Sequence, residues 1–494
     1  MLTDEKTTAK RGFVFITTAK IYFLLTSLFA QLAFPRLFGD TVLFGRYRVV
    51  SALLNVFSMV IITATVQAVS RFASQKSISD KGVIRGACIV QACLFLPIFF
   101  ALLLGSNTVA SYVFHDKTLS SPIRASSFVL LAYAFYAVFV GVINGTKRFA
   151  RQAGLDITFS TLKTLLMVFL VVLTSSVTLA FSGFAIAGFV VLLLSVFLAR
   201  PFVEGETLRP SQYLSYILPI GAWAFLLNLL LQVDVIAIKA KQFEGGADEA
   251  SLVAAVYGAA KNLATIPYQT VISLSFVAFP FVASASNAQK AKGAASSAIR
   301  ASAILSLLAL VFIYPMRADL LSVIFGAPYR EASSYMLPLL CATSFLAMMH
   351  VANAVVASAS RPFLVLWSGG LAVATQAFLL VFLLGSDTKN PANLASYATL
   401  GGCAVGGVAS LFVAFRLFEG GFFRTLFSTF LGAGVSTLIS KILEGIFHPV
   451  AIAIVATSVF VLLLFITKGV TLEEVKSLLA SGRRRPNLQD SEHL

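Results

Sequence analysis

Three lysines lie inside long apolar segments of the sequence, where a charged side chain is costly. Lys20, Lys163 and Lys261 each have polar neighbours in an otherwise apolar run. A charge at membrane depth costs about 2.5–3.5 kcal/mol on insertion scales, so such residues persist where they face water or a partner. A cavity that holds several cations and few anions attracts an anionic substrate. The alternative, that the lysine chains extend to lipid headgroups, stays open.

Asp234 is the acidic residue that the sequence places at membrane depth, because it interrupts the run Leu229–Ile236. It could pair with Lys261 or Lys20, or it could bind a coupling cation. A carboxylate near the outer interface, balanced by Lys239 and Lys241, is an equal alternative. Both interpretations stay open at this point.

Four helix-breaking residues in two apolar segments are candidates for hinges. Pro219 and Gly221 interrupt one segment, and Pro267 and Pro280 interrupt the next. Proline removes a helix hydrogen bond and permits a kink, which membrane helices generally tolerate. These positions therefore predict bending points.

The sequence predicts no metal site, cofactor or catalytic group. Its four cysteines lie in apolar runs and form no C-x-x-C pair: Cys88, Cys93, Cys341 and Cys403. The sequence has no phosphate-cradling G-x-x-x-x-G-K-[ST] motif, and no Ser/His/Asp arrangement is visible. His350 could suggest a membrane acyltransferase, although a lone histidine is more often a packing residue. These observations favour a transporter over an enzyme.

The composition defines the elements that must position these residues. Of 494 residues, 58% are hydrophobic and 12% are charged, and the mean hydropathy is +0.90. Such a chain cannot bury its apolar residues in a water-soluble core, and it is not disordered. Apolar runs of about 20 residues span a bilayer as helices. The sequence therefore predicts an all-α membrane protein of about 14 transmembrane helices.

The predicted spans follow one another along nearly the whole chain. Their cores are 13–34, 49–70, 83–105, 125–146, 157–176, 178–199, 212–238, 252–282, 298–315, 333–357, 362–384, 394–415, 425–446 and 449–467. Two of the divisions rest on short polar interruptions, at Ser175–Ser176 and at His448–Pro449.

Positive charges indicate the orientation of the chain. The net charge is +16, and most lysines and arginines lie in the loops that are cytoplasmic if the N-terminus is inside. The positive-inside rule then predicts that both termini are cytoplasmic. It also explains the basic charge without nucleic acid. After Lys468 we expect a short interfacial helix, followed by a basic tail.

The two halves of the chain are weakly similar. Residues 47–74 align with residues 257–284 at a constant offset, with Tyr47 opposite Tyr257 and Ala68 opposite Ala278. Both segments run in the same direction, which predicts a parallel repeat of six spans plus six, an arrangement found in transporters. A chance alignment of apolar helices is the alternative.

Several short segments resemble one family. They are Phe34–Gly39 with Phe44–Tyr47, Gln67–Phe72, Leu230–Asp234, Val256–Ala260 and Ile324–Tyr329. In order and spacing they resemble the polysaccharide-export branch, the O-antigen (Wzx-type) flippases, of the multidrug/oligosaccharidyl-lipid/polysaccharide (MOP) flippase superfamily. The resemblance covers nearly the whole chain.

The resemblance implies two six-helix lobes around a V-shaped cavity and two additional helices. The expected divisions are 1–209 and 210–418 for the lobes, 419–467 for the additional pair, and 468–494 for the interfacial helix and tail. It implies alternating access that moves a polyprenyl-diphosphate-linked oligosaccharide to the outer leaflet of the bacterial cytoplasmic membrane, for export of O-antigen, a part of lipopolysaccharide, or another surface polysaccharide.

The resemblance also assigns expected roles. Lys20 and Lys261 stand on spans that supply diphosphate-binding cations in such flippases, with Lys163 as a further candidate. Lysine lacks the planar fork of arginine, so Arg46 and Arg48 at the outer mouth are expected to compensate. Membrane lipids and the polysaccharide polymerase machinery are the other expected partners. A multidrug cation antiporter and a membrane enzyme of glycan assembly are the alternatives.

Overall fold

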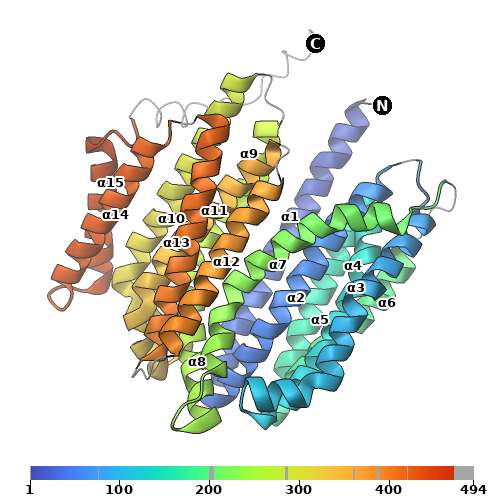
Figure 1. Ribbon diagram of the computed structural model, residues 1–494, viewed down its shortest axis with the longest axis horizontal. Coiled ribbons are helices and arrows are strands. Elements are labelled where there is room, and N and C mark those ends of the chain that lie inside the picture. Colours follow the sequence, from blue (N-terminus) through green and yellow to red (C-terminus); the bar gives the residue numbers. More distant parts are fainter. Residues whose placement is uncertain are drawn as a thin grey trace. The chain divides into compact units, whose positions relative to one another are not determined.

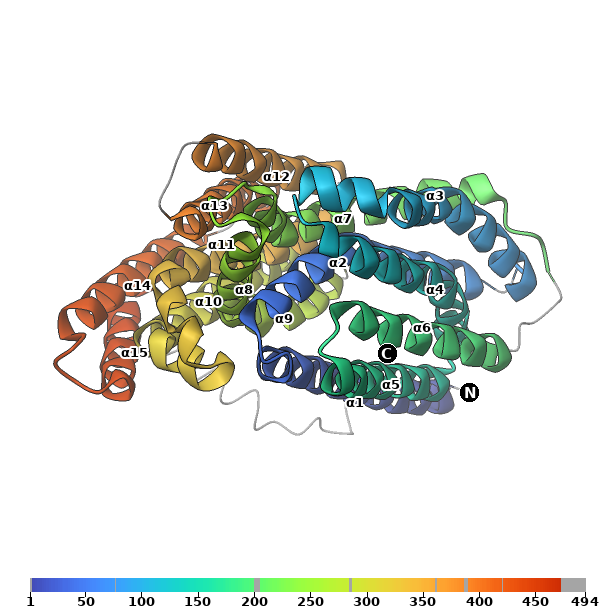
Figure 2. The same ribbon diagram turned by 90° about the horizontal axis from the view of Figure 1, so that it is seen from below.

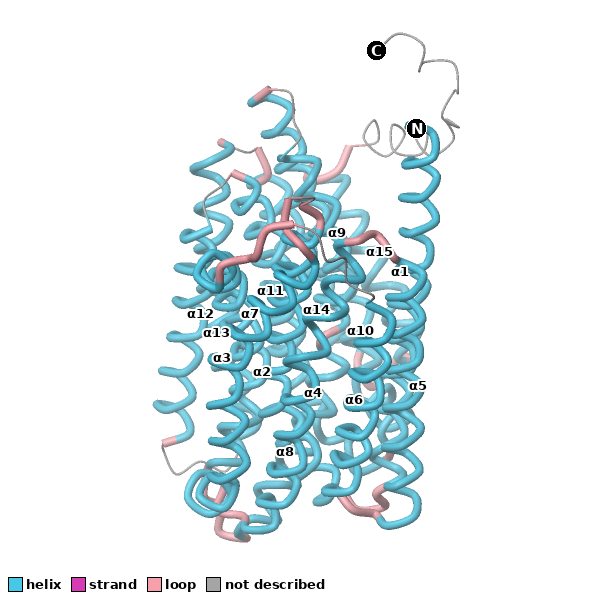
Figure 3. Tube along the Cα trace, turned by 90° about the vertical axis from the view of Figure 1, so that its right-hand side faces the viewer, coloured by secondary structure: helices cyan, strands magenta, loops and turns pink. Residues whose placement is uncertain are grey.

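The computed structural model describes residues 2–75, 77–199, 205–283, 287–359, 362–385, 390–419 and 421–471. In this part of the chain, long helices are joined by short loops (Figures 1 and 3). One isolated parallel bridge pairs Ile78 with Glu206. The predicted all-α membrane fold is confirmed.

The helices follow the predicted spans closely. In chain order they are α1 (Leu2–Leu37), α2 (Thr41–Ala73), α3 (Asp80–Thr108), the π-helix η1 (Val109–Val113), the 3-10 helix η2 (Lys117–Leu119), α4 (Ser120–Gly145), α5 (Phe149–Thr174), α6 (Val177–Ala199), α7 (Pro210–Ala240), α8 (Gly246–Ala264), α9 (Ile266–Ala283), α10 (Ala288–Phe325), the 3-10 helix η3 (Ala327–Tyr335), α11 (Met336–Ser358), α12 (Pro362–Leu384), α13 (Pro391–Phe418), α14 (Phe423–Leu443) and α15 (Pro449–Ile466). Among the described residues, 13 helical segments are long and apolar enough to cross a membrane.

The predicted span 252–282 accounts for the difference between 14 and 13. It is two helices, because α8 ends at Ala264 and α9 begins at Ile266. Pro267 therefore stands in the first turn of α9, where proline is tolerated, and not inside a continuous helix. At the break, the hydroxyl of Thr343 on α11 donates to the carbonyl of Ala264 at 2.5 Å. A side chain thus satisfies a carbonyl at the helix end.

Local backbone and capping features end the helices at the two polar interruptions that the sequence predicted. Ser175 adopts a left-handed conformation, with φ of 51°, and separates α5 from α6. His448 caps α15, and Pro449 supplies its first residue, where a missing N–H costs nothing. Both predicted divisions are confirmed. The predicted interfacial helix and basic tail lie almost wholly outside the described residues.

Contacts divide the chain into two compact units. One unit comprises Met1–Lys261, Leu321–Tyr335 and Leu366–Gly402, and the other comprises Asn262–Leu320, Met336–Val365 and Cys403–Leu494. The boundary at Lys261 falls in the last turn of α8, just before the break at Thr265. The lobes expected from the sequence repeat stay a prediction.

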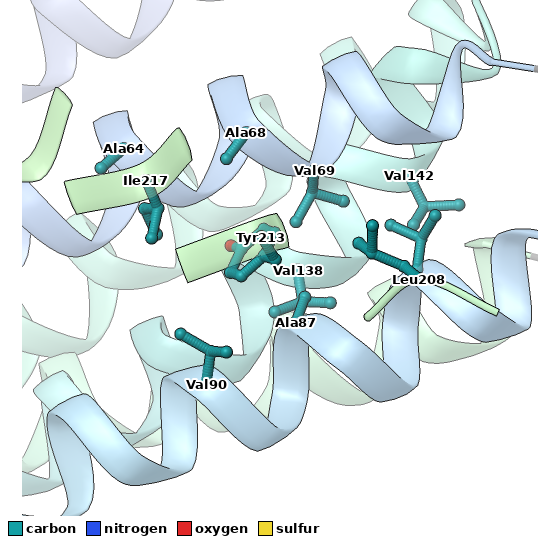
Figure 4. Packing of buried hydrophobic residues seen from close by; sticks show 11 residues of the cluster. Ala64, Ala68, Val69, Ala87, Val90, Val138, Val142, Leu208, Tyr213 and Ile217 are labelled. Atoms are coloured by element: carbon teal, nitrogen blue, oxygen red, sulfur yellow. The ribbon is translucent and has the colours of Figure 1, made fainter. Parts of the chain in front are cut away.

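In the first unit, α2 packs closely against α4 and α7, and α1 packs along α5 (Figure 2). Small residues make the close approach possible. A Cβ added at Gly145 of α4 would lie 2.5 Å from the carbonyl oxygen of Ser70 on α2. Nearby, Tyr213 of α7 is fully buried in an apolar cluster with α2, α3 and α4 (Figure 4).

In the second unit, α9 packs on α11, and α14 and α15 form an antiparallel hairpin (Figure 1). Gly432 of α14 lies against the ring of Phe460 on α15. One guanidinium nitrogen of Arg317 on α10 donates to both carboxylate oxygens of Glu444, at 2.7 and 2.9 Å, which ties the end of α14 to α10.

The close packing of α2 and α4 gives a stability prediction. Gly145→Ala should lower the free energy of unfolding by about 1–3 kcal/mol, because the added methyl meets a backbone carbonyl that cannot rotate away. Gly154→Ala is the control, since no atom of the described residues lies within 4 Å of its added Cβ. Thermal unfolding of the detergent-solubilised variants measures both. Equal stability of the two variants would contradict the packing.

Candidate functional site

A fully buried carboxylate lies inside the first unit. Asp234 of α7 is 0% exposed, and the ammonium of Lys261 on α8 holds both of its oxygens, at 2.5 and 2.6 Å. The hydroxyls of Tyr257 and Thr399 donate to Oδ2 at 2.7 and 2.8 Å. The backbone N–H of Val235 donates to Oδ1 at 2.8 Å. Three helices, α7, α8 and α13, therefore meet at one charge.

Helical spacing explains why these side chains converge. Leu230, Asp234 and Ile238 are four residues apart on α7, and all three are buried. Tyr257 and Lys261 are also four residues apart, so they share a face of α8. Hydrogen bonding extends the group further. Gln376 of α12 donates to the hydroxyl of Thr399 at 3.0 Å. The buried charge is thus both paired and hydrogen-bonded, as a low-dielectric position requires.

Arg48 of α2 is a second cation beside this pair. Its side chain crosses α8 at Gly258, where an added Cβ would lie 2.7 Å from Nε. The guanidinium interacts electrostatically with Asp234, and Nε is buried with no hydrogen-bond partner among the described residues. The group formed by Arg48, Asp234 and Lys261 therefore carries one net positive charge. We call it the central charge cluster.

Closer to the start of α2, a second charge network links four segments of the chain. Lys239 of α7 is fully buried and donates to Asp116, Ala247 and Ser251, at 2.8, 2.7 and 2.6 Å. Arg46 of α2 bridges Asp116 at 3.2 Å and Asp248 of α8 at 2.7 Å. We call these residues the peripheral network. Its cations are balanced by carboxylates.

Helices α2 and α8 approach each other closely beside the peripheral network. A Cβ added at Gly45 would lie 1.9 Å from the carbonyl oxygen of Ser251. Only a residue without a side chain fits this contact.

Asp116 lies in the loop between η1 and η2, and its protonation links the stability of the peripheral network to pH. Burial raises the pKa of Asp116, but hydrogen bonds from Lys239 and Thr118 and the charges of Lys239 and Arg46 outweigh burial. The pKa therefore lies below its ordinary value. Its stabilising contribution is present above the unfolded-state pKa of about 3.9 and is lost as the pH falls through the folded-state value.

A third group of polar side chains lies between α1 and α5. Lys20 forms an ion pair with Asp156 at 3.1 Å, and its side chain is 60% exposed. Tyr22 and Thr161 share a hydrogen bond of 2.8 Å between their hydroxyls. Lys20 therefore lies among polar side chains from both α1 and α5.

Lys163 of α5 lies over two aromatic rings instead of beside a carboxylate. Its ammonium is 4.8 Å from the ring centroid of Phe23 on α1 and 5.4 Å from that of Phe184 on α6. Among the described residues, no carboxylate lies within ion-pair distance of Lys163. A ring face attracts a cation without cancelling its charge, so the ammonium keeps its potential for an anion.

The structure decides between the pairings that the sequence left open. Asp234 pairs with Lys261, whereas Lys20 pairs with Asp156, so a pair between Asp234 and Lys20 is wrong. Lys239 holds Asp116 and not Asp234, since the chain brings α7 beside the loop before η2. The five candidate cations are thus distributed over four places: the central charge cluster, the peripheral network, the ion pair of Lys20, and the rings beside Lys163.

Several side chains of the candidate site were missed by the sequence analysis. Tyr257 could have been found from its spacing to Lys261. Thr399, Gln376, Asp116 and Asp156 gave no such signal, because their partners are distant in the sequence.

The hinge candidates and His350 lie outside the charge clusters described above. Pro219 and Gly221 lie inside α7, a continuous and curved helix (Figure 1). Pro280 lies within α9. His350 packs edge-on against Tyr268, with 5.6 Å between ring centroids. No group of three or more His, Cys, Asp or Glu side chains in the described residues could hold a metal ion.

Comparison with solved structures identifies the fold. A lipid II flippase, MurJ, in an inward closed conformation matches with a TM-score of 0.66 and 13% identity, over 91% of this chain and 98% of that chain. An inward-facing multidrug resistance transporter of the MATE family matches with a TM-score of 0.61 and 14% identity, over 79% and 98%. A MOP superfamily transporter from Pyrococcus furiosus matches with a TM-score of 0.59 and 14% identity, over 83% and 96%. The chain therefore has the fold of MOP superfamily transporters.

The family follows from the sequence match. A family model described as "polysaccharide biosynthesis protein" matches residues 42–334, more than half of the chain, and the chain belongs to that family. No curated protein sequence matches it significantly. The superfamily recognised from the short motifs is confirmed.

The peripheral network predicts a pH-dependent stability difference. Asp116→Asn should lower the free energy of unfolding by about 3–5 kcal/mol at pH 7, because it leaves the fully buried Lys239 without a charge partner. The difference from the native protein should stay constant down to about pH 5 and shrink below about pH 4. Thermal unfolding across this pH range measures it.

Glu444→Gln is the matched control for this prediction. It also removes a carboxylate from an arginine, but Glu444 is half exposed, so the loss should be about 0–1 kcal/mol. An Asp116→Asn variant as stable as this control at pH 7 would contradict the role of the peripheral network.

Proposed function

We propose that the protein flips a polyprenyl-diphosphate-linked oligosaccharide from the inner to the outer leaflet of the bacterial cytoplasmic membrane, by alternating access. The observation that carries this proposal is the excess of cations in the membrane-spanning helices. Arg48 and Lys163 have no carboxylate within ion-pair distance among the described residues. A diphosphate supplies the negative charge that such positions attract.

The family and the fold support the same class of activity. The family concerns polysaccharide biosynthesis, and one solved protein with this fold is called a lipid II flippase. Other proteins with the fold are multidrug transporters, so the fold alone does not select the cargo. The charge balance favours an anionic cargo over a cationic drug. O-antigen and other surface polysaccharide units belong to the proposed class of cargo.

The proposed grip on the diphosphate differs from the one that the sequence suggested. Arg46 is occupied by Asp116 and Asp248, and Lys261 is occupied by Asp234. We assign the first contacts with the diphosphate to Lys163 and Arg48. Lys20, which is paired with Asp156 but largely exposed, is a further cation for the same ligand. Asp234 is the proposed coupling group. The termini are proposed to be cytoplasmic, with the polymerase machinery receiving the flipped lipid.

Neutralising an unpaired cation should impair transport. Lys163→Met keeps the apolar stem that lies over Phe23 and Phe184 and removes the charge. A charge-assisted contact is worth about 1.5–3 kcal/mol, so we expect export to fall by about 10- to 100-fold. Lys292→Gln is the control, because Lys292 has a distant partner, Glu419 at 3.9 Å, and lies at the start of α10.

The measurement uses a strain depleted of the chromosomal protein and carrying each variant. A membrane-impermeant sugar probe reports which leaflet holds the polyprenyl-diphosphate glycolipids, and mass spectrometry identifies them. Complete lipid-linked units should accumulate on the inner face with Lys163→Met and not with Lys292→Gln. Incomplete units would indicate an assembly enzyme. Unchanged glycolipids together with loss of drug export would favour the multidrug antiporter.

A further inference from the structure

We propose that Lys261 exchanges between Asp234 and a phosphate of the substrate, and that a proton or a monovalent cation takes its place on Asp234. This inference rests on the proposed function and describes how the two ligands are coupled. In one state Lys261 pairs with Asp234, as the structure shows, and in the other state it pairs with the phosphate.

The geometry around Asp234 makes the ammonium a replaceable ligand. Lys261 holds both carboxylate oxygens, at 2.5 and 2.6 Å, as a small cation would. The hydroxyl oxygens of Tyr257 and Thr399 lie 2.7 and 2.8 Å from the same carboxylate. Hydroxyls can donate or accept hydrogen bonds, so they can serve either an ionised or a protonated carboxyl group. The site therefore keeps its polar partners when the ammonium leaves.

Arg48 places a second cation beside Lys261, where the two can hold one anion. The side chain of Lys261 is 6% exposed, whereas that of Asp234 is 0% exposed, so the lysine is the less deeply buried member of the pair. Arg48 crosses α8 at Gly258, one turn before Lys261 on the same face. A phosphate bound by Arg48 at this face competes with Asp234 for the ammonium.

Charge balance then requires a replacement cation. If Lys261 turns to the phosphate, Asp234 is left as a buried carboxylate, and breaking a buried pair is strongly unfavourable. Uptake of one positive charge removes this cost. The two binding events are therefore cooperative, and each ligand raises the affinity for the other by the same factor.

Asp234 is the group that can take up this charge. The elements packed around it contribute Lys261 and Tyr257 from α8, Arg48 from α2, and Tyr335 beside Tyr257. Thr399 and Gln376, from α13 and α12, do not titrate in the accessible range. Among the described residues in these contacts, Asp234 is the carboxylate. Proton uptake at this site therefore reports on Asp234.

The test measures binding of undecaprenyl diphosphate to the full-length protein in phosphatidylcholine nanodiscs, by native mass spectrometry. If a monovalent cation replaces Lys261, the native protein should bind undecaprenyl diphosphate about 10-fold more tightly in sodium chloride than in choline chloride of equal concentration. If a proton replaces it, binding should be about 10-fold tighter at pH 5.5 than at pH 7.5. The salt comparison holds screening constant, and its two arms separate a monovalent cation from a proton.

Two variants assign the effect to the pair. Asp234→Asn removes the competitor for Lys261, so it should bind the diphosphate about 10-fold more tightly than the native protein at low cation concentration. Its affinity should no longer depend on sodium, and any pH dependence that remains belongs to the lipid. The neutral double variant Asp234→Asn/Lys261→Gln should bind weakly under all conditions. Native cation dependence retained in Asp234→Asn would overturn the exchange.

A measurement on the unmodified protein covers the case in which the variants do not fold. Adding undecaprenyl diphosphate in weak buffer should cause net uptake of about one proton per protein, or sodium should raise the affinity. Absence of both effects would overturn the exchange while leaving flipping possible. If the native protein binds the diphosphate no better than phosphatidylglycerol, the proposed function itself fails.

Discussion

The neutralisation of Asp234 by Lys261 is the interaction on which the arrangement of the first unit depends. A carboxylate with no exposure cannot remain ionised in an apolar bundle without a close counter-charge and several hydrogen bonds. Meeting that requirement brings α7, α8 and α13 to one point, and Gln376 extends the contact to α12. The charges are therefore structural ties between helices as well as candidates for transport chemistry.

Helix packing and charge placement support each other along α2. Its partners approach closely where glycine stands, at Gly145 on α4 and Gly258 on α8. The second of these glycines makes room for Arg48, so the same small residue that permits close packing also positions a cation. Lys163 uses a different solution, because aromatic rings hold its ammonium without cancelling the charge. The unit thus combines neutralised and unneutralised cations.

Sequence reasoning predicted the helices well because length and apolar composition determine them. The division at Ser175 was visible as a polar interruption, whereas the break at Thr265 was not, since proline in an apolar run is compatible with a kink or an end. The pair of Asp234 and Lys261 was one of several predicted pairings. The partners of Lys20 and Lys239 are far away in the sequence, and only tertiary packing brings Asp156 and Asp116 to them.

The contact between Gly45 and Ser251 has a practical consequence. Because a single methyl group at position 45 would overlap a backbone carbonyl of α8, it would act as a wedge between two helices. The wedge introduces no charge and removes none. Position 45 therefore offers a way to disturb the spacing of α2 and α8 sterically, independently of the electrostatics of the neighbouring arginines.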